Sequence, residues 1–398
     1  MTLPATDITP FRVEIPQRDL DDLAARLSAT RWPGEVAGAG ARYGMPLAVI
    51  KRLAGRWRDG YDWRAAEAAL NQLPQFTTTV DGQRIHFLHV TSPEPDAVPL
   101  LLLHGWPSTV LEFSKVIGPL TDPGRHGGDP SRAFHVVVPS LPGFGFSGPT
   151  TEPGWDSARA ARAFAELMTR LGYPRWGAAG SDVGALIGRE LGILAPPGLA
   201  GVHLLQIFAF PSGDAAETAR MSKADIDSLS GATAEFQGKA GYQNIQRTRP
   251  QTLGYGLTDS PVAQLAWNAE LWTGWGDYAD YLDVDAFLSH VSSYWFTRTG
   301  VSSARQYYED ARTGAGYRDA RNPVPTAVGV FPQDYRTIRV CAQRANNIVR
   351  YTEYGRGGHF GYVTDPDLVT EDLREFFHAT ATVTGPGPGG GAPSRDPG

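Results

Sequence analysis

The chain has 398 residues, which at roughly 150 residues per domain predicts two or three domains and excludes a peptide or a single small module. Its 36 basic and 42 acidic residues leave a formal net charge of −6, so nothing in the charge balance favours binding to nucleic acid or to anionic membranes. The single cysteine, Cys341, excludes an intramolecular disulfide and a multi-cysteine metal site. With 41% hydrophobic residues, we expect a globular cytoplasmic protein without a nucleic-acid partner.

The two ends carry no targeting or packing signal. Residues 1–11 contain neither a basic start nor a long apolar run, so we expect no signal peptide and no membrane anchor. At the other end, ten of the 14 residues from 385 to 398 are Gly or Pro, and we expect a disordered tail over 381–398.

Hydrophobic periodicity predicts a helical N-terminal extension over 1–75, with helices near 20–27, 47–57 and 61–73. Strand patterns then begin at 76–80 and 84–90, separated by the hairpin signal Asp81-Gly82. Further apolar strands alternate with helical stretches, with strands at 100–103, 134–138, 176–179 and 202–208 and helices at 158–171 and 185–194. This alternation predicts a mainly parallel sheet covered by helices on both faces.

The block from 213 to 321 is helical and aromatic, and it is followed by two more strands (326–330, 348–353) and a helix (365–377). We therefore expect a helical cap inserted into one α/β core, whose two parts span 76–212 and 322–380.

The segment Gly180-Ser181-Asp182-Val183-Gly184 lies between a predicted strand and a predicted helix. Small residues two before and two after Asp182 permit the tight turn of a nucleophile elbow. Ser181 in that role would need a small residue in place of the β-branched Val183. The alternative is that Asp182 merely caps the helix, and this motif alone does not decide between the two.

Three more groups complete a catalytic pattern. The strand at 100–103 ends in His104-Gly105-Trp106-Pro107, the position of a loop that supplies one oxyanion-hole N–H, with the second N–H coming from Val183. Asp334 and His359 each follow a later strand, which gives the order nucleophile, acid, histidine. His104 is expected to be structural, and His378 falls near the end of the terminal helix, so we predict His359 as the base.

Two other patterns do not carry chemistry. Residues 143–148 fit G-x-G-x-x-G, but the following proline-rich stretch cannot open the helix that a dinucleotide needs. The histidines show no metal-ligand spacing. We expect neither a metal nor another cofactor.

These motifs resemble those of the epoxide hydrolases of the α/β-hydrolase fold, specifically the microsomal and juvenile-hormone type with an N-terminal extension. The resemblance covers roughly residues 7–380 and rests on these segments together with 11–16, 141–147, 241–242, 248–250, 259–261, 331–334 and 357–360. Two departures matter: we expect no counterpart of the membrane anchor that the microsomal branch has before this segment, and Asp334 stands where that branch typically has Glu.

The resemblance implies a covalent mechanism. Asp182 would attack the epoxide carbon to form an ester, while Tyr242 and Tyr307 donate hydrogen bonds to the epoxide oxygen. His359, oriented by Asp334, would then activate water. The oxyanion would be held by the N–H groups of Trp106 and Val183, the Trp106–Pro107 bond is expected to be cis, and a vicinal diol is released. Tyr308 adjoins Tyr307 and stays open as the second donor.

Between residues 242 and 308, 13 of 67 residues are aromatic, which favours an apolar substrate, although most of these rings should form the core of the cap. Candidate pocket residues are Trp267, Trp272, Trp295, Tyr308 and Phe360. The expected partners are a small-molecule epoxide and water, and the sequence is compatible with a homodimer. It does not choose between a xenobiotic epoxide and one from a natural-product pathway of the enediyne kind.

Three alternatives are less consistent with these residues. A haloalkane dehalogenase typically has Trp directly after the nucleophile, where this chain has Val183. A serine esterase would need Ser in place of Asp182. A non-catalytic ligand-binding protein of the same fold would be expected to have lost part of the catalytic set.

Overall fold

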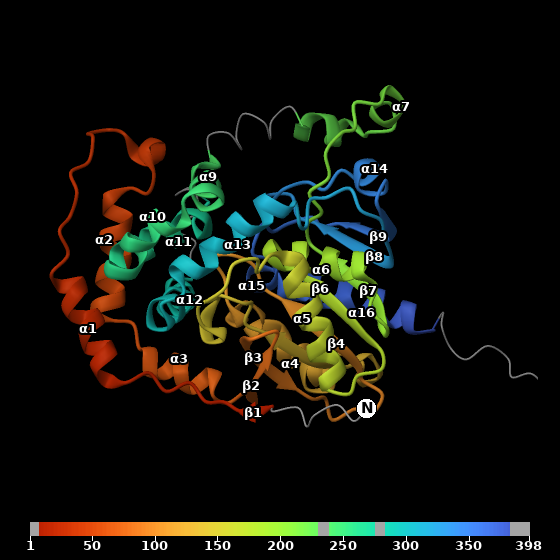
Figure 1. Cartoon of the computed structure of the whole chain (residues 1–398), viewed down its shortest axis with the longest axis horizontal. Helices are drawn as coiled ribbons and strands as arrows, with labels where there is room; N and C mark the ends of the chain where they lie inside the picture. The colour runs from red at the N-terminus through yellow and green to blue at the C-terminus, as the bar shows by residue number, and fades with distance from the viewer. Residues whose placement is uncertain (1–7, 230–238, 275–282, 383–398) are drawn as a thin grey trace, which may run out of the picture.

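The computed structural model describes residues 8–229, 239–274 and 283–382, and Figure 1 shows the arrangement. Of the predicted tail, 381–398, the first two residues still belong to a helix that runs to Thr382, and the part from 383 onward lies outside the described residues. One nine-stranded sheet has the order β1-β2-β3-β5-β4-β6-β7-β8-β9. Its strands are β1 (Thr9–Pro10), β2 (Gln75–Val80), β3 (Gln83–Val90), β4 (Val98–Leu103), β5 (Phe134–Pro139), β6 (Trp176–Gly180), β7 (Leu199–Leu204), β8 (Asn322–Val330) and β9 (Asn346–Glu353).

The sheet is parallel from β5 through β9 and antiparallel at the β1–β3 end, which confirms the predicted α/β class. Successive side chains of a strand point to opposite faces. Leu101 and Leu103 pack in the cluster that includes two helices, α5 (Ser157–Arg170) and α6 (Val183–Leu194). Leu100 and Leu102 pack on the other face with α4 (Ser114–Thr121) and α16 (Pro366–Thr382). Two apolar layers therefore enclose the sheet.

The N-terminal extension contains three helices, α1 (Gln17–Ser28), α2 (Leu47–Asp59) and α3 (Trp63–Leu70), and ends in the β2–β3 hairpin. At the hairpin, Asp81 and Gly82 both have positive φ, of 50° and 74°, as a tight two-residue turn requires. The extension also supplies the edge strand β1, which pairs with Phe76 and Thr77 of β2. Sequence periodicity predicted helices only, because a two-residue strand is too short to show alternation.

The inserted block carries α7 (Ala215–Thr218), α9 (Gly241–Thr248), α10 (Pro250–Asp259), α11 (Pro261–Trp272), α12 (Val284–Thr297) and α13 (Gly300–Thr313). In Figure 1 the helices α10–α12 lie between the extension and the core. Trp57 of α2 donates to Ser292 Oγ of α12 at 2.9 Å, and Arg56 pairs with Asp285 at 2.7 Å. The extension therefore packs on the outer side of the cap.

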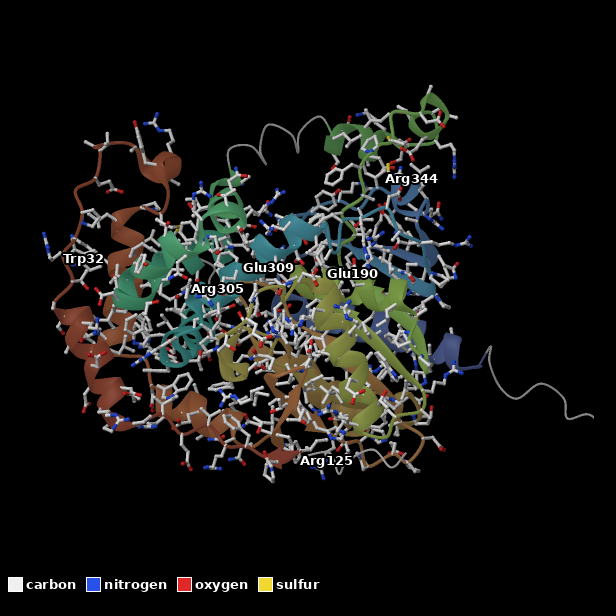
Figure 2. The ribbon with its side chains drawn as sticks, in the orientation of Figure 1. Trp32, Arg125, Glu190, Arg305, Glu309 and Arg344 are labelled. Carbon is white, nitrogen blue, oxygen red and sulfur yellow. The ribbon has the colours of Figure 1, made fainter. Side chains whose placement is uncertain are left out.

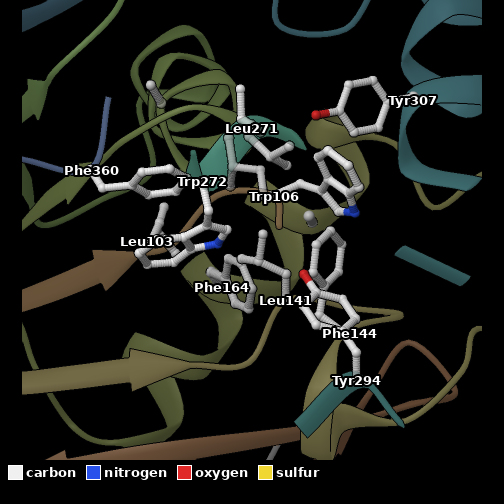
Figure 3. Close-up of a cluster of buried hydrophobic side chains, with 14 of the residues drawn as sticks. Leu103, Trp106, Leu141, Phe144, Phe164, Leu271, Trp272, Tyr294, Tyr307 and Phe360 are labelled. Carbon is white, nitrogen blue, oxygen red and sulfur yellow. The ribbon is translucent and has the colours of Figure 1, made fainter. Parts of the chain in front are cut away.

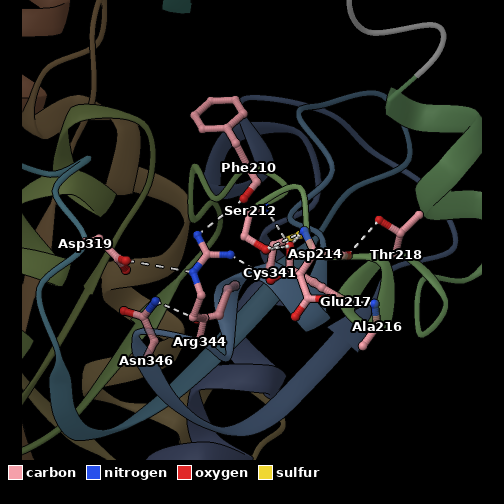
Figure 4. A network of polar contacts seen from close by, with 11 residues as sticks. Phe210, Ser212, Asp214, Ala216, Glu217, Thr218, Asp319, Cys341, Arg344 and Asn346 are labelled. Carbon is pink, nitrogen blue, oxygen red and sulfur yellow. Dashed lines mark hydrogen bonds and ion pairs between the residues drawn. The ribbon is translucent and has the colours of Figure 1, made fainter.

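The first helix of the inserted block, α7, packs on the core rather than on the cap (Figure 4). Glu217 accepts from Arg344 Nη1 at 2.7 Å, and Cys341 of α14 (Arg339–Ala342) lies with its Sγ 3.7 Å from the same carboxylate. Burial raises the pKa of the Cys341 thiol to about 11, and the carboxylate of Glu217 adds to this rise. The chain that leaves β7 is thus fixed to the core before the cap begins.

The G-x-G-x-x-G segment ends in a single 3-10 turn, Gly145–Ser147, and the next helix begins only at Ser157. Its backbone binds the cap, because Ser302 Oγ donates to Gly143 O at 2.5 Å and Gly145 N donates to Thr299 Oγ1 at 3.1 Å. The glycines therefore serve a close contact between core and cap. Over the described ranges, no helix combines the length and the apolar character needed to cross a lipid bilayer.

Candidate active site

Asp182 occupies a strained turn between β6 and α6, with φ 49° and ψ −120°. A Cβ on Gly180 would lie 2.5 Å from Gly184 O, and a Cβ on Gly184 would lie 2.0 Å from Leu103 O. Only glycine therefore fits at both positions. Asp182 holds the N-cap position of α6, but its side chain makes no capping hydrogen bond to the second or third amide of the helix, as the helix-cap alternative would require.

The Asp182 carboxylate faces the loop that follows β4. Trp106 N donates to Asp182 Oδ1 at 2.8 Å, the amide of Val183 also bonds the carboxylate, and the Trp106–Pro107 peptide is cis as expected. A Cβ on Gly105 would lie 2.8 Å from Oδ1, so this approach requires glycine. Burial raises the pKa of Asp182, although the charge of His359 and the two amides oppose the rise.

His359 lies in the loop between β9 and α15 (Gly361–Thr364), next to the loop that carries Asp334. Gln333 N donates to Gly357 O at 3.3 Å, which ties the two loops together. His359 Nδ1 donates to Asp334 Oδ1 at 3.0 Å, and its Nε2 lies 3.9 Å from Asp182 Oδ2. Burial lowers the pKa of His359. Three nearby carboxylates, those of Asp334, Asp182 and Glu112, outweigh this effect and raise the pKa to about 9.

His104 has a structural role. Its Nδ1 donates to Gly105 O at 2.9 Å, and its Nε2 accepts from Leu141 N at 3.2 Å. Burial lowers the pKa of His104 to about 4, so the imidazole is neutral near pH 7. It therefore fixes the loop that presents the Trp106 amide.

Two cap tyrosines pack on the indole of Trp106, and Figure 3 shows one of them, Tyr307, beside it. Tyr242 of α9 stacks on it with ring centroids 5.2 Å apart, and Tyr307 of α13 meets it edge-on at 5.9 Å. The hydroxyl of Tyr307 is buried and points back toward the cluster. Burial, together with the charge of Asp182, raises the pKa of both phenols, which keeps them protonated as hydrogen-bond donors.

Tyr308 points elsewhere. Its hydroxyl accepts from Arg312 Nη1 at 3.3 Å, and the same guanidinium lies 5.5 Å from its ring. It lines a separate cavity of about 440 Å³ between the core segment 142–155 and the cap helices α10 and α13. Arg305 and Glu309, labelled in Figure 2, line this cavity as well. The structure thus places Tyr307, not Tyr308, beside Trp106 on the loop that faces Asp182.

The remaining predicted pocket aromatics divide into two groups. Trp272 stacks on Phe360 at 3.9 Å and donates to Pro107 O at 3.4 Å, and Phe360 meets the His359 ring at 4.9 Å. By contrast, Trp295 lies under Arg26 of the extension, and Trp267 donates to Gln246 inside the cap. Trp272 and Phe360 therefore lie beside His359 and the loop of Trp106, whereas Trp295 serves the contact with the extension.

Sequence reasoning missed two polar residues of the site. Glu112, 1% exposed, accepts from Ser181 Oγ at 2.6 Å and from Gly105 N at 3.3 Å, and burial raises its pKa. Gln206 accepts from Asp182 N at 2.7 Å and donates to Asp334 Oδ2. A signal for Gln206 was present, since it is a polar residue in an otherwise apolar run after His203.

The predicted strand 202–208 is wrong at its carboxyl end. The strand β7 ends at Leu204, and Ile207 N donates to Thr337 Oγ1 at 2.8 Å instead of joining the sheet. The turn away from the sheet is what brings Gln206 to the site.

A carboxylate on a strand-to-helix turn, two amides that bind it, and a histidine with its acid on later strands are the arrangement of an enzyme of the α/β-hydrolase fold. Two family profiles match this chain: "Epoxide hydrolase N terminus" over residues 8–113 and "alpha/beta hydrolase fold" over 98–232.

Relatives extend the match to nearly the whole chain. A Stigmatella aurantiaca protein named "Putative epoxide hydrolase" is 45% identical over 93% of this chain and 84% of its own. "Epoxide hydrolase 1" of Sus scrofa is 32% identical over 93% of this chain and 88% of its own. The chain belongs to the epoxide hydrolase family.

Solved structures agree with this assignment. The juvenile hormone epoxide hydrolase of Bombyx mori superimposes with a TM-score of 0.86 at 27% identity, covering 96% of each chain. The Aspergillus niger epoxide hydrolase gives 0.83 at 30% identity, covering 94% of this chain and 97% of its own.

Proposed function

We propose that this chain hydrolyses an apolar epoxide to a vicinal diol through an ester on Asp182. The observation that supports this most directly is the position of the Asp182 carboxylate. It lies on the amide of Trp106, with His359 Nε2 3.9 Å away and the cap tyrosines packed around the same indole. A nucleophile, a base and donors for a leaving oxygen thus converge on one loop.

In the first step an Asp182 oxygen attacks an epoxide carbon and the C–O bond of the ring breaks. Tyr242 and Tyr307 donate hydrogen bonds to the oxygen that leaves as an alkoxide. Because the ester removes the charge of Asp182, the pKa of His359 falls and its proton is released as the alkoxide gains one. His359 then enters the second step as a neutral base.

In the second step His359 takes a proton from water, and the resulting hydroxide attacks the ester carbonyl. The amides of Trp106 and Val183 stabilise the oxyanion. Collapse of this intermediate breaks the bond between the carbonyl carbon and the diol oxygen, and the Asp182 carboxylate keeps one oxygen from water.

The surroundings favour an apolar or aromatic substrate. Trp106, Tyr242, Trp272 and Phe360 belong to one buried apolar cluster that spans core and cap. A haloalkane substrate is less favoured because Val183, directly after the nucleophile, offers no side-chain N–H to a halide. Assays with styrene oxide and with a 1-haloalkane separate the two activities.

Single-turnover hydrolysis in ¹⁸O-labelled water, with enzyme in excess, tests the ester directly. The first diol is expected to contain unlabelled oxygen, because its new hydroxyl oxygen comes from Asp182. Mass spectrometry of the diol, and of the proteolytic peptide that contains Asp182, gives the result. Label in the first diol and none in the peptide would mean that water attacks the epoxide itself.

The rate of ester hydrolysis is expected to rise with pH and then level off, because only neutral His359 can act as the base. In the free enzyme the pKa of His359 is about 9, held up against burial by Asp334, Asp182 and Glu112. Ester formation removes one of these charges, so the midpoint should lie below 9. Stopped-flow single turnovers between about pH 5 and 9.5 measure it, and a rate that falls with pH would contradict this assignment.

A further inference from the structure

Gln206, just beyond β7, connects the nucleophile to the acid. Its side chain is 1% exposed, its Oε1 accepts from Asp182 N at 2.7 Å, and its Nε2 donates to Asp334 Oδ2. The two contacts fix the direction of the amide, since the reverse orientation would set N–H against N–H and oxygen against carboxylate. We propose that Gln206 is a positioning residue that holds Asp182 and Asp334 in register for ester hydrolysis, an inference that rests on the proposed function.

On the nucleophile side, the contact supports an unfavourable backbone. Asp182 has a φ of 49°, in the region that residues other than glycine rarely adopt. Such a conformation persists only where its surroundings fix it. The bond from Asp182 N to Gln206 fixes the first peptide of this turn, and the Asp182 carboxylate thereby stays on the amides of Trp106 and Val183.

On the acid side, the contact prevents rotation of the Asp334 carboxylate. Oδ1 accepts from His359 Nδ1 at 3.0 Å, while Oδ2 accepts from Gln206. A carboxylate held at both oxygens keeps the proton of His359 on Nδ1 and turns Nε2 toward Asp182. Since ester hydrolysis depends on this imidazole and ester formation does not, loss of Gln206 should affect the second step more.

Two substitutions separate the parts of this role. Gln206→Leu has a similar size and removes both hydrogen bonds. Gln206→Glu keeps an acceptor for Asp182 N but sets a second carboxylate beside Asp334. The matched control is Gln83→Leu, since Gln83 is another buried glutamine, 5% exposed, whose amide donates to Ser147 O at 3.0 Å away from the site.

The rates of ester formation and ester hydrolysis are measured separately in single turnovers, with the pH dependence of hydrolysis and the melting temperature of each variant. For Gln206→Leu we expect hydrolysis to slow by up to about 10²-fold, with a smaller change in ester formation. For Gln206→Glu we expect the midpoint of the pH profile to rise, because a negative charge added beside Asp334, the hydrogen-bond partner of His359, strengthens the hold of His359 on its proton. Gln83→Leu should change neither rate.

The inference is overturned if both Gln206 variants hydrolyse the ester at the wild-type rate with an unchanged pH profile. It is also overturned if they slow both steps equally while losing as much thermal stability as Gln83→Leu, which would indicate a purely structural role. Failure of the proposed function looks different: in that case neither the wild-type enzyme nor the His359→Gln variant forms an ester at Asp182.

Discussion

The His359→Gln variant is expected to stop after one chemical event, with the substrate esterified to Asp182. In the proposed mechanism, ester formation needs the Asp182 carboxylate and the tyrosine donors, and glutamine at position 359 leaves these in place. Hydrolysis of the ester needs a base, and removal of a general base slows a step by about 10²–10⁴-fold. Intact-protein mass spectrometry should show an increase equal to the mass of the epoxide, located in the peptide that contains Asp182.

Two control variants make this result specific. Asp182→Asn should form no adduct, because an amide is a poor nucleophile. His378→Gln should retain normal turnover, since His378 lies on α16 and packs at 5.2 Å against the ring of Phe134, at the amino end of β5, whereas Asp182 follows the carboxyl end of the parallel strand β6. Full turnover by His359→Gln, or an adduct that persists in Asp182→Asn, would refute the assigned roles.

The double substitution Tyr242→Phe with Tyr307→Phe is expected to abolish measurable ester formation. In the proposed mechanism each phenol donates to the oxygen that gains charge as the ring opens, and loss of one such donor typically costs about 10²–10³-fold in rate. Both rings would remain, so their packing on Trp106 should survive. Rapid-quench single turnovers, with the covalent adduct measured by intact-protein mass spectrometry, follow ester formation in the wild-type enzyme and in this variant.

Tyr308→Phe is the matched control for this experiment. Its hydroxyl bonds Arg312 and its ring lines the separate cavity, so ester formation should stay within about twofold of the wild-type rate. If Tyr308→Phe instead slowed ester formation as much as Tyr307→Phe, the assignment of the second donor to Tyr307 would be incorrect.

Local sequence alone determined several features of this protein. The Asp81-Gly82 turn, the alternation of apolar strands with helices, and the spacing of Gly180 and Gly184 around Asp182 each depend on sterics within a few residues. The close approaches at these two glycines show why that spacing is informative, since any side chain there would collide with backbone. The order of Asp182, Asp334 and His359 along the chain likewise follows from the positions of the strands.

Other features were decided by contacts between distant segments. Adjacent residues on a helix point about 100° apart. Which of Tyr307 and Tyr308 faces Trp106 therefore depends on how α13 packs on the core, and no local sequence pattern distinguishes the two. The same holds for Trp295, which the N-terminal extension covers, and for Trp272, which meets Phe360 from another part of the chain.

Gln206 and Glu112 illustrate the limit most clearly. In sequence each is a single polar residue in a mostly apolar stretch, and only the tertiary structure brings them against Asp334, Asp182 and Ser181. Sequence thus determined which groups could react, because reactivity depends on residue type and local turn geometry. Tertiary structure decided which groups hold them in place, because a buried hydrogen bond depends on where separate strands and loops converge.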